Sequence, residues 1–190
     1  MARSELIPIL KSEISPYLGL PYFINTGVNK NSGADEYVGK GNAKMIALAT
    51  IEFANENKIK IIDLSPSELY RFQKKHHLGI DCSGLVCQII NVMARKFNQN
   101  LVLDVRHTSA NMLTSLPLAT QIDLKEMKPT DLVRQKNGHH VAMIVEINQE
   151  DILYVESSLS RRGVKYGQIN INDPLFFAQG LFRLNNLSIG

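Results

Sequence analysis

One stretch, Gly-Ile-Asp-Cys-Ser-Gly-Leu-Val-Cys at residues 79–87, combines a turn, a thiol and the start of a helix. Gly79 favours the turn, and Asp81 suits the N-cap position because its carboxylate accepts from the free N–H groups of a first helical turn. Apolar residues then recur with the spacing of a single helix face: Val86, Ile89, Ile90, Met93 and Phe97. This stripe predicts a buried α-helix of about four turns, with Cys82 at its N-terminus.

A thiol at a helix N-terminus lies where the helix dipole and the unpaired N–H groups favour an anion. The same N–H groups can hold the oxyanion of an attacked carbonyl. Cys82 is therefore a candidate nucleophile. The alternative is a small buried apolar residue, which is how most cysteines inside proteins behave. Cys87 fits that alternative, because it follows the apolar Val86 and has no polar neighbour.

A thiolate nucleophile needs a base within hydrogen-bond reach and a third group that orients the base. His140 opens a β-branched strand directly after an Asn-Gly turn, and Glu156 ends the next strand. Antiparallel neighbours bring the start of one strand beside the end of the next, so these two side chains are expected together. His139 is the alternative base, since adjacent strand residues point to opposite faces. Taken singly, each would be an ordinary residue at a strand end.

The composition suits one globular domain over residues 1–190, with 44% hydrophobic and 21% charged residues. A net charge of +3 is compatible with an anionic partner such as a cell-wall polymer. No Lys/Arg-rich run with interleaved aromatic residues indicates nucleic acid. The two cysteines lie five residues apart on one predicted helix, which argues against a disulfide between them. No cysteine and histidine spacing suggests a metal site, and no cofactor is expected.

The N-terminal residues carry apolar runs of only two to four residues, broken by charges. This pattern is not that of a signal peptide, and no apolar segment is long enough to span a membrane. The chain is therefore expected to be made in the cytoplasm, to have no membrane partner, and to need a non-classical route if it acts outside. The sequence leaves the oligomeric state open.

Predicted helices precede predicted strands, which indicates the α+β class. Helices are expected over residues 1–20 (ending near Pro16), 42–57, 65–75 and 109–116, besides the one that begins at Cys82. Strands are expected from Leu132 and over residues 140–147, 152–156, 163–166 and 181–184. Residues 28–40 are rich in Asn, Gly, Lys and Ser, and are expected to form an exposed loop.

Three motifs in this order resemble the NlpC/P60 family of cysteine peptidases. They are Asp-Cys-Ser-Gly-Leu-Val at 81–86, Lys-Pro-Thr-Asp-Leu-Val at 128–133 and His-Val-Ala-Met-Ile-Val at 140–145. In the family, the first motif is DCSG followed by F or L and then V, the second is a KPGDLV-like turn, and the third is HVGIY. A polar residue then follows as the third member of the site, after the Cys and the His. The resemblance runs from residue 79 to about residue 160. It implies a papain-like α+β fold, with N-terminal helices packed on an antiparallel sheet.

The resemblance also implies hydrolysis of amide bonds in the stem peptides of bacterial peptidoglycan, commonly the γ-D-glutamyl–diaminoacid bond. Cys82 would be the nucleophile. His140, rather than His139, would be the base, because the family histidine directly precedes the valine. Glu156 would orient the base, at a position where the family most often has histidine. With a glutamate at this position, the chain also resembles the related CHAP amidases.

Other positions of the pattern are matched less closely. His107 aligns with the arginine of a Pro-Arg-Thr-Ser motif, and together with Asp81 and Ser83 it is expected near the substrate. The family has a tyrosine in a PY-x-x-GG segment that contributes to the oxyanion site. Tyr22 has the matching surroundings, whereas Tyr70 has only the more usual spacing; we favour Tyr22, with an aromatic core anchor as the alternative. Residues 30–77 would then be a helical insertion that covers or narrows the cleft.

Two other classes of function are compatible with the sequence. One is a transferase or deamidase that uses the same thiol on an amide outside peptidoglycan. The other is a binding module that has kept the fold without catalysis.

Overall fold

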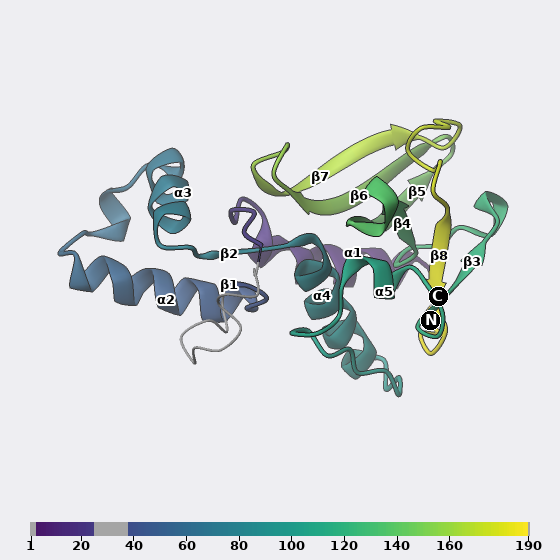
Figure 1. Cartoon of the computed structure of the whole chain (residues 1–190), viewed down its shortest axis with the longest axis horizontal. Helices are drawn as coiled ribbons and strands as arrows, with labels where there is room; N and C mark the ends of the chain where they lie inside the picture. The colour runs from purple at the N-terminus through teal and green to yellow at the C-terminus, as the bar shows by residue number, and fades with distance from the viewer. Residues whose placement is uncertain (1–2, 25–37, 190) are drawn as a thin grey trace.

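The structure, a computed structural model, describes residues 3–24 and 38–189 (Figure 1). Its α-helices are α1 (Arg3–Ile14), α2 (Ala43–Glu56), α3 (Pro66–Lys75), α4 (Cys82–Lys96) and α5 (Ala110–Leu113). Short 3-10 helices are η1 (Ser15–Tyr17), η2 (Ile61–Asp63), η3 (Leu124–Glu126) and η4 (Lys136–Gly138). No helix among the described residues is long and apolar enough to cross a membrane.

The strands that follow the helices form, within the described residues, a six-stranded antiparallel sheet in the order β3-β8-β4-β5-β6-β7. They are β3 (Ala119–Ile122), β4 (Leu132–Gln135), β5 (His140–Asn148), β6 (Asp151–Ser158), β7 (Gly163–Asn170) and β8 (Leu181–Leu184). The α+β class is confirmed. Strands β4 to β7 form the predicted meander, while β8 returns to lie between β3 and β4. Strand β3 was not predicted from the sequence.

The sheet has a buried core on each face. On β5, Val141, Met143 and Val145 belong to the larger core, in which the apolar residues of α1 and α4 pack against the sheet. The alternate residues Ala142 and Ile144 belong to a smaller core on the other face. This alternation is the period of a strand with both faces covered. The predicted stripe of α4 lies in the larger core, as does Cys87.

Helices α2 and α3 extend from the end of the molecule opposite the sheet (Figure 1). Both have capped N-termini: the Asn42 side chain accepts from the Met45 N–H, and Ser65 forms a capping box with Glu68. These helices belong to the segment predicted as an insertion, of which residues 30–37 lie outside the described residues. The loop predicted over residues 28–40 falls largely outside them as well.

The prediction of a turn at Gly79 is wrong. Gly79 belongs to β2 (Gly79–Ile80), which pairs in parallel with β1 (Val38–Gly39). A side chain there would clash with the preceding segment, since an ideal Cβ on Gly79 would lie 2.3 Å from the Pro21 carbonyl oxygen. The same oxygen accepts from the Ile80 N–H at 2.9 Å. The glycine thus allows the chain around Pro21 to lie directly against the strand that leads into α4.

Candidate active site

Cys82 is the first residue of α4 and is buried. The Asp81 carboxylate accepts from the Gly84 N–H at 2.6 Å and so caps the helix as predicted. Gly84 is required here by close packing, because an ideal Cβ on it would lie 2.3 Å from the Gly39 carbonyl oxygen. That oxygen also accepts from the Asp81 N–H at 2.9 Å. The β1–β2 pair therefore fixes the N-terminus of the helix that carries the thiol.

His140 and Glu156 meet, as the sequence predicted. The imidazole Nε2 of His140 lies 2.5 Å from Oε2 of Glu156, and the two residues are only 4% and 8% exposed. Met143 on β5 pairs with Val155 on β6, so Glu156 follows directly and lies diagonal to His140 on adjacent strands. With Nε2 occupied by the carboxylate, Nδ1 is the ring nitrogen left for the thiol.

The electrostatics of this group favour a charged imidazole. Burial lowers the pKa of His140, but hydrogen bonds to Cys82 and Glu156, with the negative charge of both groups, raise it to about 9. Burial raises the pKa of Glu156, but the His140 hydrogen bond and the positive charges of His140, Arg161 and Lys136 bring it below its ordinary value. At neutral pH the imidazole is therefore cationic and the carboxylate anionic.

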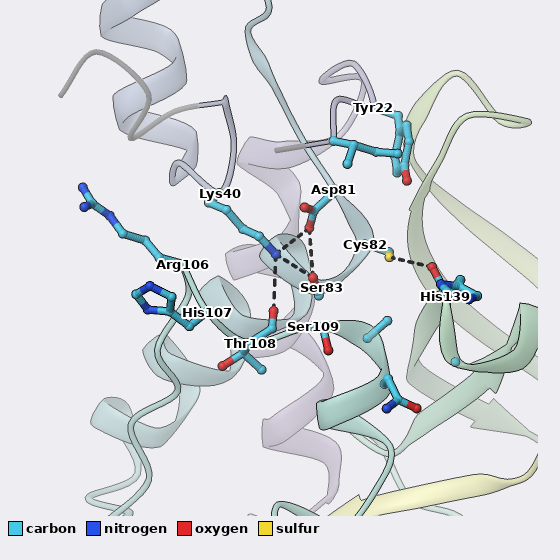
Figure 2. A pocket seen from close by; sticks show the side chains of 14 residues that line it. Tyr22, Lys40, Asp81, Cys82, Ser83, Arg106, His107, Thr108, Ser109 and His139 are labelled. Carbon is cyan, nitrogen blue, oxygen red and sulfur yellow. Dashed lines mark hydrogen bonds and ion pairs between the residues drawn. The ribbon is translucent and has the colours of Figure 1, made fainter. Parts of the chain in front are cut away.

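The sulfur of Cys82 also lies 4.0 Å from the carbonyl oxygen of His139 (Figure 2). A contact of that length is weak. The thiol is also hydrogen-bonded to the His140 ring. His139 itself lines the neighbouring pocket.

A pocket of about 510 Å³ opens beside the thiol. It is lined by Tyr22, Ile24, Lys40 and the segments 81–83, 106–111 and 138–139. In Figure 2, Cys82 and His139 lie on one side of it, and Arg106 and His107 on the opposite side. Of the described part of the predicted insertion, only Lys40 lines the pocket, and helices α2 and α3 contribute no lining residue.

Tyr22 is half-buried and lines the pocket, whereas Tyr70 lies on α3. Burial, and then the negative charges of Cys82 and Asp81, raise the pKa of Tyr22 to about 12. Its hydroxyl therefore stays protonated at neutral pH and is available as a donor.

Lys40, which was not predicted as a site residue, is buried in the pocket wall. Its Nζ lies 3.0 Å from Oδ1 of Asp81, 2.6 Å from Oγ of Ser83 and 3.3 Å from the Thr108 carbonyl oxygen. Ser83 in turn donates to Asp81 at 3.1 Å. Asp81 and Ser83 are thus joined in one network beside the thiol (Figure 2). Lys40 lies 42 residues before Cys82 in a polar segment, and no local pattern distinguished it.

His107 lies on the rim of the pocket and is largely exposed. Its Nδ1 is 2.7 Å from Oδ2 of Asp104, three residues earlier. The adjacent Arg106 and Thr108 also line the pocket. The segment that the sequence analysis aligned with a substrate-contacting motif is therefore at the pocket, with its charged side chains on the side away from Cys82.

Arg161 was also missed. Its Nε lies 2.7 Å from Oε1 of Glu156, the carboxylate oxygen that does not contact His140. Arg161 belongs to the turn between β6 and β7, where an exposed arginine is the ordinary expectation, so only the folded structure shows the contact.

Among the described residues, no group of three or more His, Cys, Asp or Glu side chains is placed to hold a metal ion. Both cysteines are free, and burial is the main cause that raises the pKa of Cys87 to about 12. Comparison of the chain with family models, curated proteins and solved structures gives no significant match.

Proposed function

We propose that this protein is a cysteine peptidase or amidase of the NlpC/P60 type, with a papain-like fold. The observation that carries the proposal is the grouping of three residues far apart in sequence: Cys82 at a helix N-terminus, His140, and Glu156 bonded to the far side of the imidazole. This is the arrangement of nucleophile, base and orienting group that thiol-dependent acyl transfer requires. The pocket beside the sulfur provides space for a substrate.

In the proposed reaction, the proton of the Cys82 thiol resides on His140, and the thiolate attacks the carbonyl carbon of an amide. The carbon–sulfur bond forms as the carbonyl becomes an oxyanion. When the oxyanion collapses, the carbon–nitrogen bond breaks and the imidazolium gives its proton to the departing amine. Glu156 stabilises the imidazolium and keeps the ring in one orientation throughout.

Two donors are suited to the oxyanion. The first turn of a helix has N–H groups without intrahelical partners, and Asp81 accepts from only the Gly84 N–H among those of residues 82–84. The Cys82 N–H, on the same residue as the nucleophile, is therefore one candidate donor. The hydroxyl of Tyr22, which stays protonated, is the other.

In the second half of the reaction, water replaces the amine. His140, now neutral, accepts a proton from the water as its oxygen attacks the thioester carbon. The carbon–sulfur bond then breaks, a carboxylic acid leaves, and the thiolate–imidazolium pair is restored. Every proton is accounted for by His140, so the scheme uses no metal or cofactor.

For the substrate we propose amide bonds in peptidoglycan stem peptides, with the γ-D-glutamyl–diaminoacid bond as the first to test. This rests on the resemblance of the motifs around Cys82, Asp131 and His140. The pocket supports it in general terms: its lining combines the apolar surfaces of Tyr22 and Ile24 with the polar side chains of Ser109 and Asn111, the mixture typical of a ligand site.

The test is mass spectrometry of purified peptidoglycan fragments after incubation with the wild-type chain and with Cys82→Ala. New stem-peptide fragments made only by the wild type, and unaffected by a chelator, would support the proposal and identify the bond. If neither chain cleaves, yet iodoacetamide alkylates Cys82 rapidly near neutral pH, the substrate is another amide and the peptidoglycan assignment fails. Slow alkylation with the pH dependence of a free thiol would reject catalysis and favour a binding module.

A further inference from the structure

The proposed catalytic group carries an unbalanced charge. In the reactive state, a thiolate on Cys82 and a carboxylate on Glu156 surround one imidazolium on His140, so the sum is −1. A histidine in the third position, as in the resembling family, would leave the group neutral. His140 and Glu156 are nine-tenths or more buried, and an uncompensated buried charge is costly. The glutamate in this chain therefore requires a further cation.

We propose that Arg161 is that cation and acts as a positioning residue of the site, holding the Glu156 carboxylate in the orientation in which it binds His140. The inference rests on the proposed function. Each carboxylate oxygen has one partner: Oε1 accepts from Nε of Arg161 at 2.7 Å, and Oε2 faces Nε2 of His140 at 2.5 Å. Rotation of the carboxylate would break both contacts, so the arginine restricts it.

Arg161 is itself held from a second direction. Its Nη2 donates to the Tyr154 hydroxyl at 2.7 Å, and its guanidinium carbon lies 5.5 Å from the centre of that ring. Tyr154 precedes Glu156 by two residues on β6, so both side chains are on one face of the strand. Gly167 on β7 leaves room for the ring, because an ideal Cβ there would lie 2.2 Å from Tyr154 Cζ.

Other charged groups near the carboxylate do not make this contact. Lys136, in the turn before β5, lowers the pKa of Glu156 by its charge alone, and its effect is smaller than those of His140 and Arg161. Lys165 pairs with Glu156 across β6 and β7 but is exposed. Lys40 is bound to Asp81 on the other side of the thiol. Among the described residues, Arg161 alone forms an ion pair with Oε1 of Glu156.

The experiment compares Arg161→Met, Arg161→Lys and Tyr154→Phe with the wild type. Arg162→Met is the matched control, because it removes the same charge from an exposed neighbouring residue. NMR titration gives the pKa of His140 without any substrate, and steady-state kinetics on the cleaved peptide give kcat and KM. Thermal unfolding verifies that each variant is folded.

Arg161→Met should lower kcat about 10- to 100-fold with little change in KM, because a small displacement of a group that orients the base is costly in rate. The pKa of His140 should fall from about 9 in the wild type, because a released or protonated Glu156 no longer stabilises the imidazolium. Arg161→Lys should restore part of both values, Tyr154→Phe should have a smaller effect in the same direction, and Arg162→Met should match the wild type.

A folded Arg161→Met protein with an unchanged or raised His140 pKa would overturn the proposal, whatever its activity. A raised pKa would mean that Arg161 only screens a carboxylate that stays in place by itself. This result is distinguishable from failure of the proposed function. In that case the wild type itself would cleave no amide, while the effect of Arg161 on the His140 pKa could still be measured.

Discussion

Ser157 on β6 donates a hydrogen bond to the carbonyl oxygen of Ile80, 2.6 Å away, across 77 residues of sequence. Ile80 lies two residues before Cys82, and Ser157 is the residue directly after Glu156. Neighbouring strand residues point to opposite faces, so β6 presents Glu156 to His140 on one side and Ser157 to the Cys82 segment on the other. One short stretch of strand thereby contacts both His140 and the segment that leads into Cys82.

Ser157→Ala should therefore impair the site more than a surface substitution would. A fully buried carbonyl loses its side-chain donor, which should reduce the free energy of unfolding by about 1–2 kcal/mol. The value of kcat should fall about 10-fold, because small displacements of reacting groups are costly in rate. Denaturant unfolding and kinetics measure the two effects. Ser188→Ala, at an exposed position, is the control, and equal behaviour of the two variants would contradict this role.

The sequence predicted those parts of the fold that depend on local pattern. The stripe of α4, the cap at Asp81, and the β-branched run after the Asn-Gly turn each have a cause within a few residues. The His140–Glu156 contact was also predictable, because two adjacent antiparallel strands fix which ends meet. Gly79 was misinterpreted because a glycine needed for close backbone approach resembles, in sequence, a glycine needed for a turn.

The contacts that could not be predicted join segments distant in sequence. Lys40 reaches Asp81 only because β1 and β2 pair in parallel, and two-residue strands leave no periodic signal. Arg161 reaches Glu156 because the turn after β6 folds back over the strand. Ionic and hydrogen-bonding partners of this kind are specified by tertiary geometry, so they appear only once the chain is folded.

The pH dependence of activity should have a falling limb near pH 9. The proposed mechanism needs the imidazolium form of His140, whose pKa is about 9, so activity should decline as the pH rises through that value. Glu156→Gln removes a negative charge that raises this pKa, and should move the falling limb to lower pH. Profiles of kcat/KM against pH for both proteins check this. A limb that does not move would show that Glu156 does not act on His140.

The same groups predict how stability depends on pH. The pKa of His140 in the folded chain lies above its ordinary value of 6.5, so its contribution is complete below pH 6.5 and is lost as the pH rises through about 9. The pKa of Glu156 lies below its ordinary value of 4.5, so its contribution is present above pH 4.5 and is lost in stronger acid. The difference in unfolding free energy between wild type and His140→Gln should therefore be largest between these limits, at pH 4.5–6.5. A difference that grows toward pH 9 would contradict the assignment.

Lys40→Met should destabilise the fold through the helix cap. Removing the amino group leaves the buried Asp81 carboxylate without its cation, and breaking a buried ion pair in this way costs about 3 kcal/mol. Activity should fall as well, because Asp81 caps the helix that carries Cys82. The exposed Lys44→Met on α2 is the matched control and should remain within about 0.5 kcal/mol of the wild type. Equal unfolding midpoints for the two variants would show that the Lys40 network does not support the cap.

Thr130→Gly should stabilise the protein, an outcome that does not depend on any activity. Thr130 has a φ of 77° and occupies the position of the glycine in the KPGDLV-like pattern. Its N–H donates to the Ile144 carbonyl oxygen at 2.8 Å, which holds the backbone in this left-handed conformation. Such a conformation costs a β-branched residue about 1–3 kcal/mol, whereas the extra freedom of an unfolded glycine costs about 0.5–1 kcal/mol. The net gain should be about 1 kcal/mol by denaturant unfolding. Thr130→Ala keeps a Cβ and should gain less unfolding free energy than Thr130→Gly. An alanine variant as stable as the glycine variant would contradict this prediction, because the strain would then come from the threonine side chain and not from the left-handed backbone.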